Sequence, residues 1–381
     1  MIRKKKKNFM LAILLSILIT LIFTQANSYN GVFATSASSM TLIEVNSGRI
    51  LFSQNMHQRR EMASTTKVVT AITVIESCKN LDEIVVVPKQ AVGIEGSSIY
   101  LSAGEKISVR DLLYGLMLRS GNDSAVALAI HTVGSVKDFC KKMNELAAKV
   151  GAKNSNFVNP HGLHHPDHYT TAYDLAIISA YAMKNPVFKE IVSTKVHKAT
   201  WEGRDYPRVM HNKNKILSNY QGGNGVKTGY TKKAGRCLVS AAQRDNMQVV
   251  CVVLNCGPMF EECSRLMEMA FSIYPMRILV SPEKSLGSIT VLRSQQNCVE
   301  VVADQAFCYP LSDQEYKSFV YDINIRQVVY APIKKGTKIG DISGYFKDKK
   351  LFAVKAVIKE DVKILPFKER LDYILRTEEP C

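Results

Sequence analysis

Three short peptides, far apart in the chain but in a fixed order, constrain this 381-residue sequence more than any other feature. They are Ser64-Thr65-Thr66-Lys67, Ser120-Gly121-Asn122 and Lys227-Thr228-Gly229. An S-x-x-K peptide alone is weak evidence, because roughly one is expected by chance in a chain this long, and a second copy occurs at Ser281-Pro282-Glu283-Lys284. The ordered trio is stronger evidence, since each peptide supplies a chemical part that the other two lack. We therefore expect a fold that brings three distant segments to one cleft.

The first peptide has the pattern of an activated nucleophile. Serine and lysine three residues apart on a helix share one face, so the Lys67 amine can reach the Ser64 hydroxyl. A serine hydroxyl is a poor nucleophile until a neighbouring base takes its proton. Lysine can be that base if burial and a nearby positive charge lower its pKa, and Lys227 is the candidate for that charge.

The second peptide lies between two apolar helical stretches, at 112–118 and 125–130. A loop at this place can project both polar side chains into a cleft. Ser120 can relay a proton toward a leaving amine, while the Asn122 amide can hold Lys67 and a backbone group of the substrate. Both residues also suit helix capping, and the two roles are compatible.

The third peptide ends a strand that follows several glycines. A lysine beside a hydroxyl suits a free carboxylate, so Lys227 and Thr228 are candidate substrate-binding residues. The missing side chain at Gly229 lets a substrate lie against the strand. Recognition of a C-terminal carboxylate by Lys227 predicts a carboxypeptidase.

The N-terminal segment has the pattern of a secretory signal peptide. Residues 3–7 are basic, residues 9–23 are apolar, and small residues follow. We expect cleavage after Ala34, and the alternative is an uncleaved anchor that associates the chain with the membrane. Both alternatives place the body of the protein outside the cytoplasm, either secreted or at the outer face of the membrane and the cell wall.

The charge of the chain bears on its partners. A net charge of +16 suits anionic surroundings, although a scattered basic surface without a dedicated partner is the simpler interpretation. Basic and aromatic residues do not cluster as in nucleic-acid-binding modules, so we expect no nucleic-acid partner.

Residue periodicity predicts an α+β fold for the larger part of the chain. Strand patterns occur at 40–45, 50–52, 225–227, 236–242 and 248–254. Helix starts are predicted at Ser108, Ser135 and Thr171, each followed three residues later by an aspartate. Helical spacing also begins at Ser64 and recurs at 260–273. This order favours an antiparallel sheet flanked by helices.

These patterns divide the chain into four segments. After the signal peptide at 1–34, we expect the catalytic domain at 35–275. Short alternating strands and turns, including a turn at Ser312-Asp313, predict a small all-β domain at 276–365. A short tail at 366–381 follows, and an amphipathic helix at 367–375 would be too short to anchor the chain alone.

Two other residue types suggest ligands or bridges less strongly. Residues 159–168 contain four histidines and an aspartate, but their spacing matches no zinc motif and both prolines indicate an irregular loop. We expect a structured loop beside the cleft, with no metal and no other cofactor. The nine cysteines form no C-x-x-C pair, so most are expected as small buried residues. A bridge among Cys251, Cys256 and Cys263 stays open.

The phrases around the three peptides resemble the D-alanyl-D-alanine carboxypeptidases, which are low-molecular-mass penicillin-binding proteins. The S-x-x-K, S-x-N and K-T-G set is also the signature that this family shares with serine β-lactamases. The phrases are Ala63-Ser64-Thr65-Thr66-Lys67, Arg119-Ser120-Gly121-Asn122-Asp123-Ser124-Ala125, Asn156-Phe157-Val158-Asn159-Pro160-His161-Gly162-Leu163, Tyr169-Thr170-Thr171-Ala172-Tyr173-Asp174 and Gly225-Val226-Lys227-Thr228-Gly229-Tyr230-Thr231. The likeness is strong over 40–273 and vaguer beyond, where family members carry a β-rich second domain.

The resemblance implies the transpeptidase-like fold of this family and a role for each motif residue. Ser64 is implied as the acylated nucleophile and Lys67 as its base, with Ser120 and Asn122 as the relay and positioning pair. The implied substrate is the stem peptide of peptidoglycan ending in D-Ala-D-Ala, whose terminal residue is removed during peptidoglycan maturation. β-Lactams are implied as covalent inhibitors that acylate the same serine.

The resemblance also implies the residues that hold the substrate. Lys227 and Thr228 bind the terminal carboxylate beside Gly229. The backbone amides of Ser64 and Tyr230 form the oxyanion hole, where donors meet the developing negative charge.

Two alternatives stay open from the sequence. A serine β-lactamase shares the three peptides, but the E-x-x-L-N phrase of its commonest class is missing between Ser120 and Lys227. A cell-wall-binding protein with an inert site is the second alternative, and an intact Ser64 and Lys67 argue against it.

Overall fold

The computed structural model describes residues 35–366. The expected signal segment at 1–34 and the possible helix at 367–375 lie outside the described residues. Between residues 35 and 366, no helix is both long enough and apolar enough to cross a membrane.

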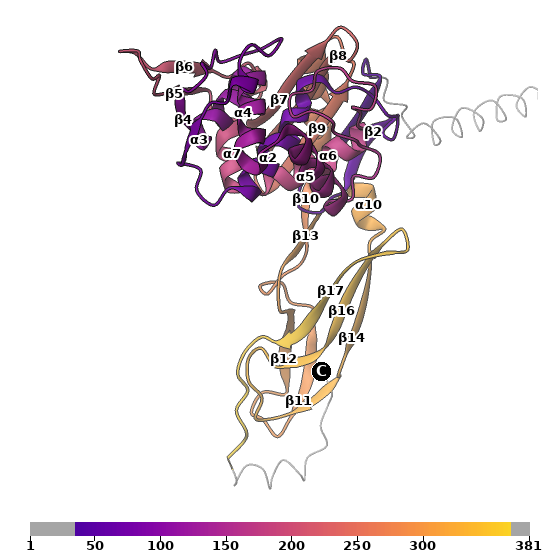
Figure 1. Cartoon of the computed structure of the whole chain (residues 1–381). Coiled ribbons are helices and arrows are strands. Elements are labelled where there is room, and N and C mark those ends of the chain that lie inside the picture. The colour runs from indigo at the N-terminus through magenta and orange to yellow at the C-terminus, as the bar shows by residue number, and fades with distance from the viewer. Residues whose placement is uncertain (1–34, 367–381) are drawn as a thin grey trace, which may run out of the picture. The chain divides into compact units, whose positions relative to one another are not determined.

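The first part of the chain is built on a five-stranded sheet with the order β2-β1-β9-β8-β7, in which all neighbouring strands are antiparallel (Figure 1). The strands are β1 (Ser39–Glu44), β2 (Ile50–Gln54), β7 (Gly223–Thr231), β8 (Gly235–Arg244) and β9 (Met247–Leu254). Each lies where the alternation of residues predicts a strand. The predicted antiparallel sheet flanked by helices is therefore confirmed.

Both faces of this sheet are covered, and strand β9 shows how. Successive side chains of a strand point to opposite faces. Val250 and Val252 pack in the core that contains α2 (Lys67–Ser77) and α6 (Ala172–Met183). Val249 and Val253 pack instead with α9 (Met259–Ile273). The sheet thus lies between two apolar layers, a larger one that contains α2 and α6 and a smaller one that contains α9.

The other elements of this part complete that layer and its surroundings. The longer helices are α3 (Val109–Tyr114), α4 (Asn122–Val133), α5 (Val136–Lys149) and α7 (Pro186–Ser193). The shorter elements are a 3-10 turn, η2 (Lys89–Ala91), a π-helical turn, η3 (Gly115–Arg119), and the helix α8 (Ile216–Asn219). Two antiparallel strand pairs join β3 (Ile84–Val86) to β4 (Lys106–Ser108) and β5 (Val196–Ala199) to β6 (Arg208–His211).

The predicted helix starts are confirmed at the atomic level. The side chains of Ser108, Ser135 and Thr171 are N-caps of α3, α5 and α6. Each accepts a hydrogen bond of 3.0 Å from the backbone N–H of the aspartate three residues later. The carboxylate in the first turn also suits the positive end of the helix dipole.

The helix predicted from Ser64 differs at its start. A 3-10 turn, η1 (Ala63–Thr66), comes first, and the α-helix α2 begins at Lys67. Two hydroxyl groups explain the tighter turn: Thr65 Oγ1 donates to the Met62 carbonyl at 2.6 Å, and Thr66 Oγ1 donates to the Ala63 carbonyl at 2.9 Å. In a regular α-helix, each of these carbonyls would accept a hydrogen bond from the backbone N–H four residues later.

The second part of the chain is rich in β-structure, as predicted. A six-stranded sheet has the order β14-β16-β17-β12-β11-β15 and encloses a core of its own. Its strands are β11 (Ser288–Leu292), β12 (Cys298–Ala303), β14 (Val320–Ile325), β15 (Val328–Tyr330), β16 (Lys338–Phe346) and β17 (Lys349–Ile358). A two-stranded sheet joins β10 (Met276–Val280) to β13 (Phe307–Pro310).

Two details of this part differ from the sequence-based expectation. Ser312 does not form a simple turn but caps a short helix, α10 (Asp313–Lys317), through a reciprocal capping box with Glu315. Cys298 is disulfide-bonded. In the first part of the chain, Cys251, Cys256 and Cys263 are all buried, and Cys251 and Cys263 are free thiols. The capping box has the S-x-x-E spacing, which is readable in the sequence.

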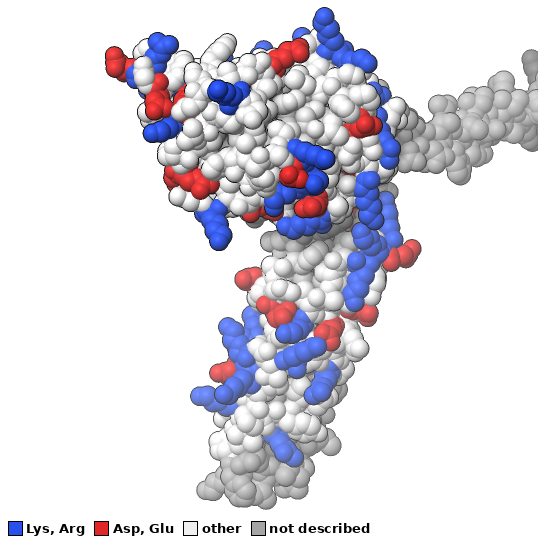
Figure 2. All heavy atoms as spheres, viewed as in Figure 1, with Lys and Arg blue, Asp and Glu red and all other residues white. Residues whose placement is uncertain are grey.

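The surface carries mixed charge. On the face shown in Figure 2, lysine and arginine side chains are spread over both parts of the chain, with aspartate and glutamate among them. This distribution fits the simpler interpretation of the basic composition.

Candidate active site

The start of α2 brings Ser64 and Lys67 together. Lys67 Nζ lies 3.0 Å from Ser64 Oγ, within hydrogen-bonding distance. The Lys67 side chain is fully buried although it is charged in water. A buried amine next to a hydroxyl is the arrangement that the first peptide predicts.

Two further oxygen atoms surround the same amine. Lys67 Nζ donates to Asn122 Oδ1 at 2.7 Å and to the His161 carbonyl at 2.7 Å. The three partners come from η1, α4 and the loop before α6, so segments nearly one hundred residues apart meet at one nitrogen. All three acceptors are neutral oxygens, and none is a carboxylate that would hold the amine in its charged form.

Lys227 from β7 adds a second buried amine, with 2% of its surface exposed. Burial, and next the positive charge of Lys227, hold the pKa of Lys67 well below its usual value, and Asp123 acts in the opposite direction. Burial lowers the pKa of Lys227 to about 7, with a smaller contribution from Lys213. The low pKa values of both lysines therefore favour a neutral amine in the site at physiological pH.

The S-x-N peptide is a tightly held loop at the start of α4. Ser120 is buried and adopts the left-handed conformation, with φ of 65°. Asn122 is fixed by its backbone N–H, which donates to the Ser97 carbonyl at 2.7 Å, and by its side chain, which donates to the Glu95 carbonyl. The left-handed conformation of Ser120 is unfavourable for a residue other than glycine, and it persists only because the surrounding residues hold it in place.

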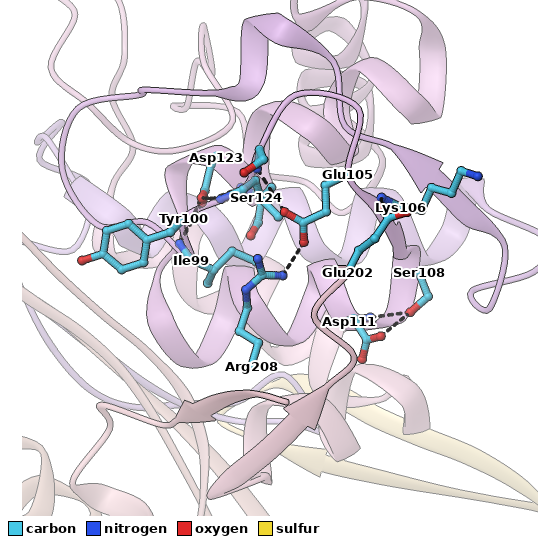
Figure 3. A network of polar contacts seen from close by, with 12 residues as sticks. Ile99, Tyr100, Glu105, Lys106, Ser108, Asp111, Asp123, Ser124, Glu202 and Arg208 are labelled. Atoms are coloured by element: carbon cyan, nitrogen blue, oxygen red, sulfur yellow. Dashed lines mark hydrogen bonds and ion pairs between the residues drawn. The ribbon is translucent and has the colours of Figure 1, made fainter. Parts of the chain in front are cut away.

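Asp123 holds the neighbouring loop in place (Figure 3). Its buried carboxylate accepts hydrogen bonds from the backbone N–H groups of Ile99 and Leu101 and from the Ser98 hydroxyl. This loop carries the two carbonyl groups that bind Asn122. The position of the Asn122 amide is thus set by a network that the S-x-N peptide alone does not reveal.

The K-T-G strand lies directly against the nucleophile. A Cβ atom at Gly229 would lie 3.0 Å from the backbone nitrogens of both Ser64 and Thr65, so glycine permits the close approach. Thr228 is half-buried beside it, and the Tyr230 side chain is 66% exposed. The strand therefore borders the site with its Lys227 amine buried and its Tyr230 ring in solvent.

The histidine-rich loop is a structured part of the site, as expected. His161 contributes its backbone carbonyl to Lys67, and burial lowers the pKa of its side chain to about 4. His164 pairs with Glu61 at 2.9 Å, and His168 Nε2 lies 2.8 Å from Thr66 Oγ1. Within residues 35–366, no group of three or more His, Cys, Asp or Glu side chains is arranged to hold a metal ion.

Two contributors to the site were missed by sequence reasoning. The His161 carbonyl carries no signal in the residue type, because every residue has a carbonyl group. Lys213 approaches the cleft, where its Nζ lies 3.4 Å from Ser97 Oγ and its charge lowers the pKa of both Lys67 and Lys227. The sequence signal for Lys213 is the Asn212-Lys213-Asn214 peptide, in which a cation lies between two turn-forming residues before the K-T-G strand.

Comparisons with known proteins agree with this geometry. Residues 24–257 match the family described as D-alanyl-D-alanine carboxypeptidase (peptidase S11), and residues 274–364 match the C-terminal domain of penicillin-binding protein 5. The D-alanyl-D-alanine carboxypeptidase DacF of Bacillus subtilis is 31% identical over 339 residues, which is 87% of each chain. The D-alanyl-D-alanine carboxypeptidase of Streptomyces sp. strain K15 is 39% identical over 222 residues, or 54% of this chain and 76% of the relative.

A solved structure shows the same architecture in both parts. Penicillin-binding protein 5 of Haemophilus influenzae superposes with a TM-score of 0.67 at 28% identity, over 87% of this chain and 98% of its own. The motifs, the contact between Ser64 and Lys67, and the family matches all indicate the same family. The chain belongs to the serine-type D-alanyl-D-alanine carboxypeptidases, the penicillin-binding hydrolases of the peptidase S11 family.

Proposed function

We propose that Ser64 is the nucleophile that forms the acyl-enzyme and that Lys67 is the base that takes its proton. In this reaction, Ser64 Oγ attacks the carbonyl of the penultimate D-Ala, and the terminal D-Ala leaves as a free amino acid. Water then hydrolyses the ester and restores the serine hydroxyl.

The observation that carries this proposal is the set of three acceptors around Lys67 Nζ. A charged ammonium group has three N–H donors, whereas a neutral amine has two donors and one lone pair. If Asn122 Oδ1 and the His161 carbonyl take the two N–H groups, the lone pair points at Ser64 Oγ, 3.0 Å away. The neutral amine is then aligned to accept the proton of Ser64.

Lys227 and Thr228 are proposed to bind the terminal carboxylate. A carboxylate beside Lys227 stabilises its charged form and compensates the cost of burying an ammonium group. The carboxylate brings a negative charge of its own, so its pair with Lys227 adds little net charge near Lys67. Burial then stays the main cause of the low pKa of Lys67.

The remaining roles concern charge and proton transfer in the tetrahedral intermediate. We assign the oxyanion hole to the backbone N–H groups of Ser64 and Tyr230, because Gly229 brings β7 against the turn that contains Ser64. Ser120, which adjoins Asn122 in the same buried loop, is assigned the relay of the proton from Lys67 to the leaving amine.

The substrate class follows from the activity. We propose that the protein trims the peptidoglycan stem peptide outside the cytoplasm and that β-lactams acylate Ser64 as mimics of D-Ala-D-Ala. Export rests on the signal pattern of residues 1–34, and membrane attachment would depend on the same segment.

The test is to label the protein with a fluorescent penicillin and locate the adduct by mass spectrometry. We expect the adduct on Ser64 and none in Ser64→Ala. The chain offers a matched control in its second S-x-x-K peptide, so Ser281→Ala should label like the parent protein. An adduct that persists in Ser64→Ala would refute the assignment.

A second measurement separates the two remaining alternatives. The parent protein should release D-Ala from a diacylated tripeptide ending in D-Ala-D-Ala and should release bound penicillin slowly. Rapid turnover of penicillin would favour a β-lactamase, and the absence of D-Ala release would favour an inert wall-binding protein.

A further inference from the structure

His168 is a buried titratable residue that the reaction described above does not use. Its side chain is 3% exposed, and its ring packs edge-on against Phe157 at 5.9 Å between centroids. Burial lowers its pKa to about 3, with smaller contributions from His161, His165 and Lys67. The imidazole is therefore neutral over the whole pH range in which an enzyme of this kind works.

The hydrogen bonds of His168 define which nitrogen carries the proton. The Val158 backbone N–H donates to His168 Nδ1 at 3.1 Å, so Nδ1 holds a lone pair. Nε2 then carries the hydrogen and donates to Thr66 Oγ1 at 2.8 Å. The Thr66 hydroxyl in turn donates to the Ala63 carbonyl at 2.9 Å. Only the neutral ring can make both contacts, since a proton on Nδ1 would face the Val158 N–H.

These bonds join two segments that each carry part of the site. On one side is the turn Ala63–Thr66, where Ala63 holds the left-handed conformation with φ of 49° immediately before Ser64. On the other side is the loop 158–168, whose His161 carbonyl binds Lys67. His168 is a polar side-chain link between the segment that carries the nucleophile and the segment that orients its base.

Two more contacts show that the loop and the turn fit closely. Thr70 Oγ1 donates to the Pro160 carbonyl at 2.7 Å. A Cβ atom at Gly162 would lie 1.9 Å from the Ala63 carbonyl oxygen, so only glycine permits this approach. A shift of the loop would therefore move the His161 carbonyl relative to both Ser64 and Lys67.

We propose that His168 is a positioning residue for acylation: its neutral ring fastens the loop 158–168 to the turn bearing Ser64 and so holds the His161 carbonyl where it directs the Lys67 lone pair at the serine. This inference rests on the proposed roles of Ser64 and Lys67. The imidazole does not exchange a proton during the reaction, and it does not touch the substrate.

The test measures the acylation rate by a fluorescent penicillin across a range of pH. His168→Phe keeps the ring packing against Phe157 but loses both hydrogen bonds, and Thr66→Val removes the partner hydroxyl with little change in volume. We expect each change to lower the rate roughly ten- to hundredfold, as a displacement of about 1 Å at a reacting group does. The double variant should be no slower than the slower single variant, because both changes break the contact between His168 and Thr66, and Thr66→Val alone also loses the bond to the Ala63 carbonyl.

The pH profile distinguishes positioning from a general loss of structure. Groups that face Lys67 are Lys227 on β7, Asp123 on α4, and Lys213 and His161 on loops. Because burial is the main cause of the low pKa of Lys67, a loosened loop that admits water should raise that pKa. The acidic limb of the acylation profile should then move to higher pH in His168→Phe and Thr66→Val. For the tripeptide substrate, kcat should fall while KM stays, since the carboxylate site on β7 is untouched.

The control is His165→Phe, a change of a half-exposed histidine in the same loop. It should acylate at the parental rate with an unshifted profile. Parental rates in both His168→Phe and Thr66→Val would overturn the inference, as would reduced rates with an unmoved acidic limb and additive effects in the double variant. Failure of the underlying roles is a separate result, because it would appear as labelling of Ser64→Ala. If His168→Phe does not fold, His168→Leu takes its place, since Thr66→Val also loses the bond to the Ala63 carbonyl.

Discussion

The two parts of this chain fill their interiors differently. The first part buries Lys67, Lys227, Asn122 and Asp123 beneath its helices, whereas in the described part of the chain from 276 onward the buried polar side chains are Ser281, Ser294 and Ser343. Burying an amine or a carboxylate costs free energy unless partners compensate it. In the first part of the chain, these costly buried groups lie where the three motifs meet. The second part has an apolar core typical of a domain that is stable without such a site.

The contrast teaches where to look for chemistry in a chain with duplicated motifs. Ser281 and Lys284 have the same spacing as Ser64 and Lys67, but Lys284 is exposed and the segment lies outside any helix. Lys284 therefore lacks the burial that Lys67 has. The two S-x-x-K peptides therefore share the same spacing and differ in the burial of their lysine.

The largest expected effect comes from removing the buried amine. Lys67→Met should lower the acylation rate by about 10²- to 10⁴-fold, the usual contribution of a general base. The measurement is the labelling rate with a fluorescent penicillin. Lys284→Met is the control and should label at the parental rate. Equal rates for Lys67→Met and the parent protein would remove the functional difference between the two regions.

The pH dependence gives the next effect. Lys67 must be neutral to accept a proton, so kcat/KM should rise with pH on the acidic side. Lys227 must be charged to bind a carboxylate, and its pKa is about 7 in the free enzyme, so kcat/KM should fall about tenfold per pH unit above that value. Lys227→Arg keeps its charge at high pH. In this variant the alkaline limb should disappear, and its persistence would show that another group causes it.

A smaller effect on acylation, but a large one on stability, is expected at the buried ion pair of Arg208 and Glu105. Arg208 Nη1 lies 2.7 Å from Glu105 Oε1, and both side chains are about 95% buried (Figure 3). The Arg208 guanidinium also lies 4.4 Å from the centroid of the Trp201 ring. Glu105→Gln leaves the arginine charge uncompensated and should lower the free energy of unfolding by about 3–5 kcal/mol.

The matched control for that change is the more exposed pair of Arg110 and Asp82, with 33% and 66% of their side chains exposed and Arg110 Nε 2.6 Å from Asp82 Oδ1. Asp82→Asn should lower the melting temperature far less than Glu105→Gln, because this pair is open to solvent and contributes little although it is bidentate. Thermal unfolding followed by circular dichroism measures both variants. Similar losses in the two would contradict the role that burial has in this argument.

The smallest effect on catalysis is expected from the second core. Phe352 is buried there, with its ring 4.6 Å from that of Phe307. Phe352→Ala should destabilise this part by about 3–5 kcal/mol, as the loss of a large core side chain does. Its acylation rate should stay parental at temperatures below unfolding. A parallel loss of acylation would mean that the two cores are not independent.

Much of this architecture is readable from the chain without coordinates. Alternating residues locate β1, β2, β8 and β9, and the capping pairs at Ser108, Ser135 and Thr171 mark helix starts because their hydrogen bonds span only three residues. The order of the three motifs indicates the reaction class for a similar reason: each motif is local. Short-range contacts leave their signal in residue types and spacing.

The tertiary structure alone decided how those pieces become a site. The His161 carbonyl, the approach of Lys213 and the link from His168 to Thr66 depend on segments that meet only after folding, and a backbone oxygen has no signature in the sequence. The same holds for the charge of Lys67, which is a property of its surroundings. Residue types supply the reactive groups. Long-range packing determines their protonation and orientation, because pKa and hydrogen-bond direction depend on the groups that lie nearby in space.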